Sequence, residues 1–173
     1  MSLTDVIDGT RAAVTADKAN AAVVFTAVST LKPGTNTGVD VRTRQHNFTV
    51  DEPPTLGGGD TAANPVEYAL AALGSCQVIT YQFWAARLGI AVESVSVRID
   101  GDLDVQGFFG FDDTTRAGFS DVRVLVELTG PETPERYEEL KRHVDEHCPV
   151  LDLFRNPTPT KTELVPDRGV RGV

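Results

Sequence analysis

The chain has 173 residues, of which 40% are hydrophobic and 24% are charged, so it can build an ordinary globular core and is neither disordered nor fibrous. Sixteen Lys and Arg side chains oppose twenty-five Asp and Glu side chains, and the formal charge is -9. Because an acidic surface repels phosphate backbones, we expect no nucleic-acid partner.

Residues 1–20 contain early acidic side chains and no apolar stretch of secretory length. We therefore expect no signal peptide, a cytoplasmic location, and a single domain over residues 1–173 in which residues 1–20 are an N-terminal extension of unpredicted order. The chain has two cysteines, Cys76 and Cys148. In a reducing compartment such a pair is more often reactive, metal-binding or buried than a structural disulfide.

Two β-branched segments, residues 21–30 and 38–50, are joined by a stretch with Pro33, Gly34 and Asn36, which favour a turn. We predict a β-hairpin of two strands here. Residues 51–64 are rich in Gly and Pro and are predicted to form a loop.

A long helix is predicted over residues 65–88, because Asn64 can cap it, Pro65 suits its first position and Gly89 offers a left-handed stop. The run from Tyr68 to Trp84 carries no charged side chain, and its length is near the short limit for a membrane span. Its polar residues make a lipid crossing unfavourable, so we expect no membrane partner. A helix that is apolar nearly all round must be enclosed by protein, and one sheet covers only one side of it. We therefore predict a homodimer.

Two further strands are predicted over residues 93–104 and 119–130, the second because its apolar residues alternate, with residues 107–118 as their connection. A second helix begins at Thr133 and Pro134. Its apolar stripe includes Cys148, which we place on the inward face. Pro149 ends this helix, a short turn follows, and residues 156–165 are predicted to form an edge strand. The order ββαββα indicates an α+β fold with antiparallel strands.

Cys76 is either a small buried hydrophobe or a nucleophile. It lies too far inside its helix for the helix dipole to lower its pKa, so a nucleophilic role requires a nearby cation. Arg87 is about 16 Å away along the helix axis and cannot serve. Arg42 and Arg44, in the second predicted strand, are the candidates for activating the thiolate, unless they only decorate a solvent-exposed face.

Two other chemistries use the same residues. His143 and His147 with Cys76 and Cys148 would offer four zinc ligands. However, Cys148 lies about 100° around the helix from His147, so we predict no metal site. A Cys-His hydrolase would pair Cys76 with His46 or His143, but no sequence feature orders such a triad.

Three segments carry a resemblance to a known family: NPVEYALAALGSC at 64–76, GDLDVQGFFG at 101–110 and HCPV at 147–150. They resemble the OsmC/Ohr family of osmotically inducible and organic hydroperoxide resistance proteins, over about residues 39–160. The resemblance implies an OsmC-like fold, with antiparallel sheets around a long central apolar helix, in an intertwined homodimer. It also implies a thiol peroxidase that needs no metal or flavin cofactor.

By this resemblance Cys76 is the peroxidatic cysteine, which attacks a small organic hydroperoxide and becomes a sulfenic acid. Cys148 is the resolving cysteine, which condenses with that acid to a disulfide. An external dithiol or a thiol protein then reduces the disulfide by exchange.

The chain departs from the family pattern at two places. The family's glutamate directly after Asn-Pro is replaced by Val66, and Glu67, one residue later, lies on the opposite helix face from Cys76. Glu67 is thus a candidate for orienting an arginine only across subunits, the alternative being compensation of the helix dipole. The family's arginine position holds Lys32 instead. These departures support an alternative function, an OsmC-like protein that binds ligands without catalysis or reacts slowly.

Overall fold

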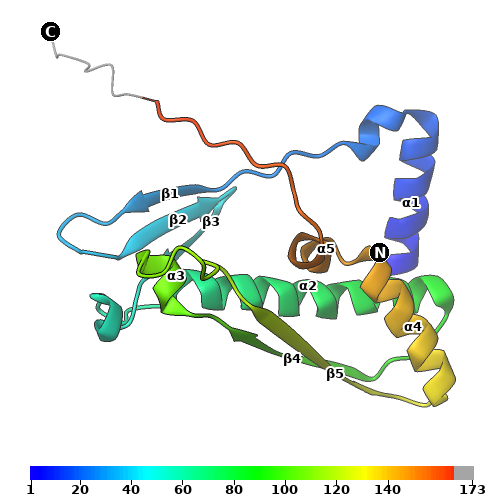
Figure 1. The fold of residues 1–173 in the computed structure, drawn as a ribbon. Coiled ribbons are helices and arrows are strands. Elements are labelled where there is room, and N and C mark those ends of the chain that lie inside the picture. Colours follow the sequence, from blue (N-terminus) through cyan, green and yellow to red (C-terminus); the bar gives the residue numbers. More distant parts are fainter. Residues whose placement is uncertain (166–173) are drawn as a thin grey trace, which may run out of the picture.

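The computed structural model describes residues 1–165, in which one long helix runs along two small antiparallel sheets and shorter helices lie at both of its ends (Figure 1). In chain order the elements are α1 (Leu3–Ala16), η1 (Lys18–Ala21), β1 (Val28–Leu31), β2 (Val39–Thr43), β3 (His46–Val50), η2 (Pro54–Leu56), α2 (Pro65–Leu88), β4 (Ser94–Asp102), α3 (Val105–Phe109), β5 (Asp121–Thr129), α4 (Pro134–His147) and α5 (Pro149–Arg155). The predicted α+β class with antiparallel sheets around a long helix is confirmed.

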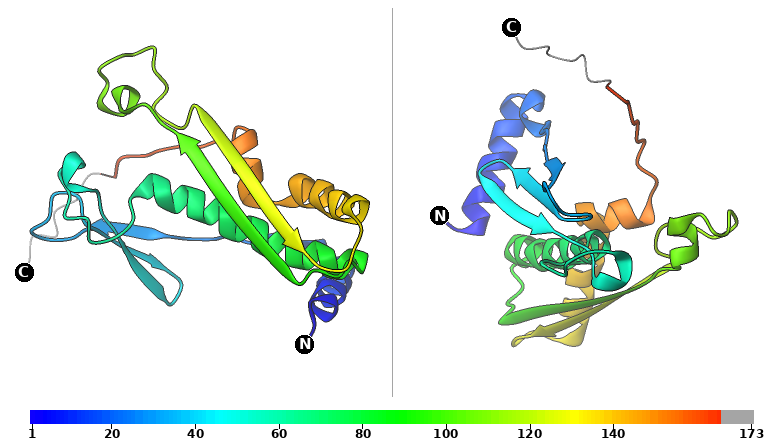
Figure 2. Two further views of the ribbon diagram at one scale, coloured as in Figure 1. Left: turned by 90° about the horizontal axis from the view of Figure 1, so that it is seen from below. Right: turned by 90° about the vertical axis from the view of Figure 1, so that its left-hand side faces the viewer.

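Helix α2 runs between the two sheets, with β1, β2 and β3 on one side and β4 and β5 on the other (Figure 2). Its predicted ends are confirmed. Asn64 accepts a hydrogen bond from the amide of Glu67, and the Glu67 carboxylate accepts one from the amide of Asn64, which together form a capping box. Gly89 ends the helix with a positive φ of 64°. No helix among residues 1–165 is long and apolar enough to cross a membrane.

The first sheet has three strands instead of the predicted two. The prediction of one strand over residues 38–50 was wrong, because β2 and β3 form a tight hairpin in which Thr43 pairs with His46. Arg44 adopts a positive φ of 52°, a conformation that Gly or Asn more often supplies. Without those residues, the sequence carried no signal for this turn. β1 is also shorter than the predicted strand over residues 21–30.

The second sheet matches its prediction. β4 and β5 pair along their whole length, from Ser94 opposite Thr129 to Asp102 opposite Asp121. Along β5, half-buried residues alternate with exposed ones, as the sequence pattern predicts for a strand with one covered face. The half-buried side packs against the buried clusters that α2 shares with α4 and α5.

The C-terminal region ends α4 where the sequence predicts, but it lacks the predicted edge strand over residues 156–165. α4 ends at His147, and Pro149 is the first residue of α5, so Cys148 lies between two helices and is 2% exposed. The predicted edge strand over residues 156–165 is wrong, since this segment has no regular structure and is exposed. Pro157 and Pro159 have no amide hydrogen to donate to a neighbouring strand.

Residues 1–20, whose order the sequence did not predict, include the well-capped helix α1. Ser2 and Asp5 form its capping box, and α1 packs against α2. The predicted single domain over residues 1–173 stays a prediction.

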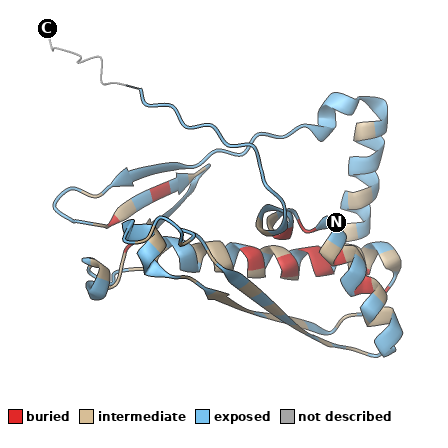
Figure 3. Ribbon diagram, viewed as in Figure 1, coloured by how far each residue is buried: buried red, intermediate tan, exposed pale blue. Residues whose placement is uncertain are grey.

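Two clusters of buried residues line up along α2 (Figure 3). One joins α2 to α4 through Tyr81, Ala85, Leu140 and Val144. The other comprises Leu73, Cys148 and Leu151. The second cluster places the C-terminal cysteine against the middle of the central helix.

A buried carboxylate organises the glycine-rich loop before α2. Asp51 accepts hydrogen bonds from the hydroxyls of Thr37 and Thr61 and from the backbone amides of Glu52, Gly59 and Thr61. Five donors around one side chain fix the path of the chain from β3 to the start of α2.

Candidate active site

The two cysteines lie together in the folded chain. The sulfur of Cys148 donates toward the sulfur of Cys76 at 3.4 Å, and both thiols are free. Cys76 is in the middle of α2, and Cys148 follows the last residue of α4. Since a disulfide bond is about 2.05 Å long, an approach of ~1.4 Å joins the two sulfurs.

Apolar side chains surround this thiol pair. Leu73, one helical turn before Cys76, is fully buried and packs with Cys148 and Leu151. Half-buried residues complete the shell: Ile99 from β4, Val122 and Val124 from β5, and Val150 and Phe154 from α5. Such a setting limits the access of water to the sulfurs.

Burial raises the pKa of the Cys76 thiol, and the neighbouring Cys148 raises it further. Two polar groups act in the opposite direction: the backbone amide of Val150, at the start of α5, lowers this pKa, and so does the hydroxyl of Thr80. Burial is the largest of these effects. Within one chain, Cys76 therefore lies in an environment that favours the thiol over the thiolate.

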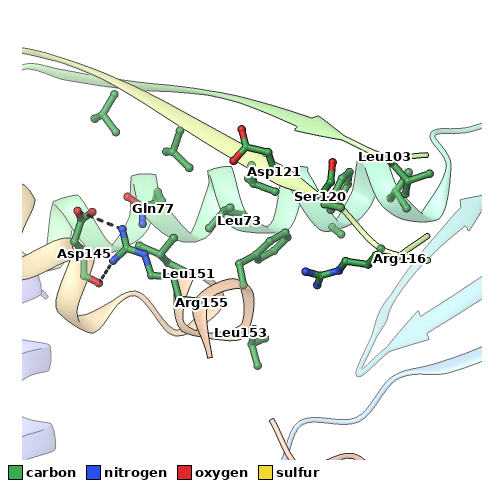
Figure 4. Close-up of a pocket in the computed structure, with 18 of the residues that line it drawn as sticks. Leu73, Gln77, Leu103, Arg116, Ser120, Asp121, Asp145, Leu151, Leu153 and Arg155 are labelled. Carbon is green, nitrogen blue, oxygen red and sulfur yellow. Dashed lines mark hydrogen bonds and ion pairs between the residues drawn. The ribbon is translucent and has the colours of Figure 1, made fainter. Parts of the chain in front are cut away.

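A hollow of about 690 Å³, whose lining is drawn in Figure 4, is bounded by residues that also pack against the thiol pair, although neither cysteine lines it. Leu73 and Leu151 line it and also pack against Cys148. Other apolar walls come from α2, β5 and α5, namely Val66, Ala69, Val122, Val124, Val126, Leu153 and Phe154. A single layer of side chains, which includes Leu73 and Leu151, thus separates the apolar surface of the hollow from the sulfurs.

Polar groups occur at the ends of the hollow. Lys141 and Arg155 both pair with Asp145, as Figure 4 shows for Arg155. Arg116, from the loop before β5, lies at the other end and forms no salt bridge within residues 1–165. Gln77 is 1% exposed, and its amide has no hydrogen-bond partner in that range.

Arg116 and Gln77 line the hollow, and neither was predicted from the sequence as a site residue. Arg116 lies in residues 107–118, which were predicted only as a connection, and Gln77 is one of the polar residues in the uncharged run from Tyr68 to Trp84. Burial of an unpaired amide beside a hollow is visible only in three dimensions.

The other predicted site residues lie apart from the sulfurs or have structural contacts. Arg42 is exposed on β2 and Arg44 is exposed in the β2–β3 turn. Neither contributes to the pKa of Cys76 within one chain. Glu67 belongs to the capping box of α2. The activating and orienting roles of these three residues stay predictions.

The histidines do not join the cysteines. His143 and His147 pack against Trp84, and one possible ligand atom of each lies within 4.8 Å of one of Glu146. The group of possible ligands that includes them among the described residues contains neither cysteine, so the predicted zinc set is not assembled there. The hydrogen bonds of the Cys76 sulfur in this range lead to Thr80 and Cys148, and none leads to a histidine.

The fold and the thiol pair together define an α+β protein whose dithiol centre joins Cys76 of the central helix to Cys148 between α4 and α5. The family described as OsmC-like protein matches residues 57–163, and the chain belongs to this family. No curated protein matches the chain at a significant level.

Solved structures share the fold. An OsmC-like protein from Mycoplasma pneumoniae superposes with a TM-score of 0.67 at 15% identity, over 77% of this chain and 88% of that chain. An organic hydroperoxide resistance protein OsmC from Legionella pneumophila gives 0.59 at 24% identity, over 77% and 90%. An organic hydroperoxide resistance protein from Elizabethkingia anophelis gives 0.60 at 20% identity, over 78% and 89%.

Proposed function

We propose that the protein is a thiol-dependent peroxidase that reduces organic hydroperoxides, with Cys76 as peroxidatic and Cys148 as resolving cysteine. The observation that carries this proposal is the 3.4 Å separation of the two sulfurs inside an apolar cluster. Two thiols at this distance suit a reaction that oxidises one and then joins both.

In the first step the Cys76 thiolate attacks the hydroperoxide oxygen that carries the hydrogen. An S–O bond forms, the O–O bond breaks, and the leaving alkoxide takes a proton to become an alcohol. Sulfur is oxidised by two electrons to sulfenic acid. Apolar walls around Cys76 exclude water and hold this acid until the second thiol reacts.

In the second step Cys148 attacks the sulfenic sulfur. The S–S bond forms, the S–O bond breaks, and the hydroxide that leaves takes the thiol proton to become water. An external dithiol or a thiol protein then reduces the disulfide by exchange. Cysteine chemistry alone balances the cycle, so the proposal includes no metal or flavin cofactor.

The hollow supports an organic substrate. Its apolar walls offer a favourable surface to an alkyl or aryl group, whereas hydrogen peroxide gains nothing from them. The similarity to proteins from Legionella pneumophila and Elizabethkingia anophelis whose names state organic hydroperoxide resistance agrees with this preference.

We also propose that the active form is an intertwined homodimer located in the cytoplasm. Large apolar side chains are exposed along one segment before and within β1, namely Val23, Val24, Phe25, Val28 and Leu31. A second subunit that covers this segment would remove a continuous apolar surface from water. In such a homodimer, Arg42 or Arg44, together with Glu67, would reach the Cys76 thiol of the partner subunit.

One observation favours the alternative, a ligand-binding or slowly reacting OsmC-like protein. Within one chain the pKa of Cys76 is raised, and no cation acts on it. If assembly supplies no cation, the thiolate fraction at neutral pH stays small and attack on peroxide is slow.

Rapid mixing of the reduced protein with cumene hydroperoxide, and separately with hydrogen peroxide, tests the proposal. We expect two free thiols to disappear together, a Cys76–Cys148 disulfide by peptide mass, and faster reaction with the organic peroxide. Cys76→Ser should abolish the reaction. Two thiols that persist over minutes, with an intact fold, would favour the alternative.

A further inference from the structure

A cluster of aromatic and ionisable side chains lies between α2 and the C-terminal end of α4, where His147 directly precedes Cys148. Trp84 of α2 stacks on His143, with ring centroids 4.7 Å apart and planes 4° apart, and His147 lies 4.5 Å from the same ring. Glu146 completes a group in which one ligand atom from each of His143, Glu146 and His147 lies within 4.8 Å of the others.

The hydrogen bonds leave both imidazoles able to act as ligands. Nδ1 of His147 lies 2.8 Å from the carbonyl oxygen of His143, and a proton on Nδ1 leaves a lone pair on Nε2. This is the arrangement in which proteins usually hold a metal-binding histidine. Nδ1 of His143 is buried and has no hydrogen-bond partner among the described residues, so no hydrogen bond of that atom fixes the tautomer of this ring.

The position on the helix suits a cation. His143 and His147 are four residues apart and therefore lie on the same face, a spacing that lets two imidazoles share one ion. All three residues are in the last turn of α4 or directly before it, where the unpaired carbonyl groups favour positive charge. Arg87, whose guanidinium lies 4.5 Å from the Trp84 ring centroid, is a nearby positive charge that disfavours a bound cation. The negative charge of the Glu146 carboxylate offsets this repulsion.

We propose that His143, Glu146 and His147 bind one divalent first-row transition ion such as Zn²⁺, Co²⁺ or Ni²⁺. Two imidazoles and a carboxylate are a ligand set for these ions, with the remaining positions open to water. The site differs from the zinc set weighed in the sequence analysis, because it uses Glu146 and neither cysteine. It is also independent of the proposed peroxidase activity.

Trp84 supplies the readout, because it is the chain's one tryptophan and it contacts both histidine rings. Reduced protein without a polyhistidine tag is titrated with Co²⁺ while tryptophan fluorescence is followed. A paramagnetic ion held by these rings should quench the emission in a saturable way with one ion per chain. EDTA should restore the emission, and diamagnetic Zn²⁺ should compete with the quenching.

Matched variants locate the ligands. His147→Gln and Glu146→Gln should each weaken Co²⁺ binding by at least the roughly tenfold that loss of an outer-shell partner costs. His46→Gln removes the only other histidine, and Glu138→Gln removes an exposed glutamate of the same helix, so both should bind as the unaltered chain does.

The thiol pair is the competing site, so the titration is repeated with Cys76→Ser/Cys148→Ser. Unchanged quenching in this variant supports the histidine site, and lost quenching overturns the proposal in favour of thiolate ligation. Absence of saturable quenching in the unaltered chain, or equal affinity in His147→Gln, also overturns it.

Discussion

The sulfur of Cys148 lies 3.4 Å from the sulfur of Cys76, although the first follows α4 and the second lies in the middle of α2. Pro149 causes this arrangement, because it ends α4 and begins α5, and the chain turns at Cys148 toward the central helix. The same turn brings the amide of Val150 to the Cys76 thiol. One break between two helices thus places both the Cys148 thiol and the Val150 amide beside Cys76.

Cys148→Ser should separate the two oxidation steps. Peroxide should still oxidise Cys76, but the sulfenic acid has no thiol to condense with. We expect trapping of Cys76 by dimedone, detected by mass, and the loss of dithiol-supported turnover by at least about tenfold. A serine keeps the volume of the site close to that of cysteine. Undiminished turnover would show that Cys148 is not the resolving residue.

The Val150 amide should control the reactivity of Cys76. In a Cys148→Ser background, Val150→Pro removes this amide hydrogen while Val150→Ala keeps it. Because this amide lowers the Cys76 pKa, the proline variant should need a higher pH to form the thiolate, and each pKa unit changes the thiolate fraction about tenfold at lower pH. The measurement is the iodoacetamide alkylation rate against pH.

Any cation that a partner subunit provides would act equally on both variants. The comparison between them therefore isolates the effect of the Val150 amide hydrogen on the Cys76 pKa. Thermal melting shows whether α5 tolerates the proline. Superimposable pH profiles from two folded variants would contradict a role for this amide.

The sequence predicted those parts of the fold that have strong local signals. Asn64, Pro65 and Gly89 mark the ends of α2, and all three act as predicted. The β2–β3 turn was missed because Arg44 adopts a positive φ without the usual glycine or asparagine. The edge strand over residues 156–165 was predicted from position in the chain, although Pro157 and Pro159 weaken any pairing.

The candidate site was predictable in part. The resemblance paired Cys76 with Cys148, and the structure brings these sulfurs together. Arg116 and Gln77 could not be found in this way, because their positions beside the hollow depend on how a loop and a helix pack. Residue spacing along one helix indicates a shared face, but it does not show which element covers that face.

Leu73→Ala should destabilise the thiol cluster. Leu73 is 0% exposed and contacts Cys148 and Leu151, and deletion of a buried leucine side chain typically costs about 2–5 kcal/mol. For a chain of this size, Tm should fall roughly 2–4 °C per kcal/mol. Leu164→Ala is the control, because Leu164 is 94% exposed. Equal melting temperatures for both variants would contradict a core role of Leu73.

Asp51 should make the free energy of unfolding depend on pH. The hydroxyl of Thr37, followed by the hydroxyl and amide of Thr61, holds the pKa of Asp51 well below its ordinary value. A lowered folded-state pKa stabilises the fold above the unfolded-state value of about 3.9, and this contribution is lost as pH falls toward the folded-state pKa. Asp51→Asn should therefore lower the urea midpoint strongly at pH 7, and the difference from the unaltered chain should shrink in acid. A difference that is constant with pH would exclude the carboxylate charge as its cause.

Arg116 should select among organic hydroperoxides. It is the lining cation of the hollow that has no salt-bridge partner within residues 1–165, whereas Lys141 and Arg155 are paired with Asp145. A hydroperoxide that carries a carboxylate at a distance from its O–O bond would place the alkyl part on the apolar walls and the charge near Arg116. A hydrogen bond to a charged group contributes about 1.5–3 kcal/mol, so Arg116→Met should reduce kcat/KM for this substrate by about tenfold or more.

Neutral cumene hydroperoxide should react with Arg116→Met nearly as it does with the unaltered chain, because methionine preserves the length and apolar surface of the side chain. The effect should appear in KM, since Arg116 binds the far end of the substrate and does not contact the reacting atoms. Arg98→Met is the matched control, because Arg98 is paired with Asp100 on exposed β4 and does not line the hollow. An equal loss for both substrates would instead mean that Arg116 shapes the loop before β5, and substrate charge would then have no dedicated partner in the hollow.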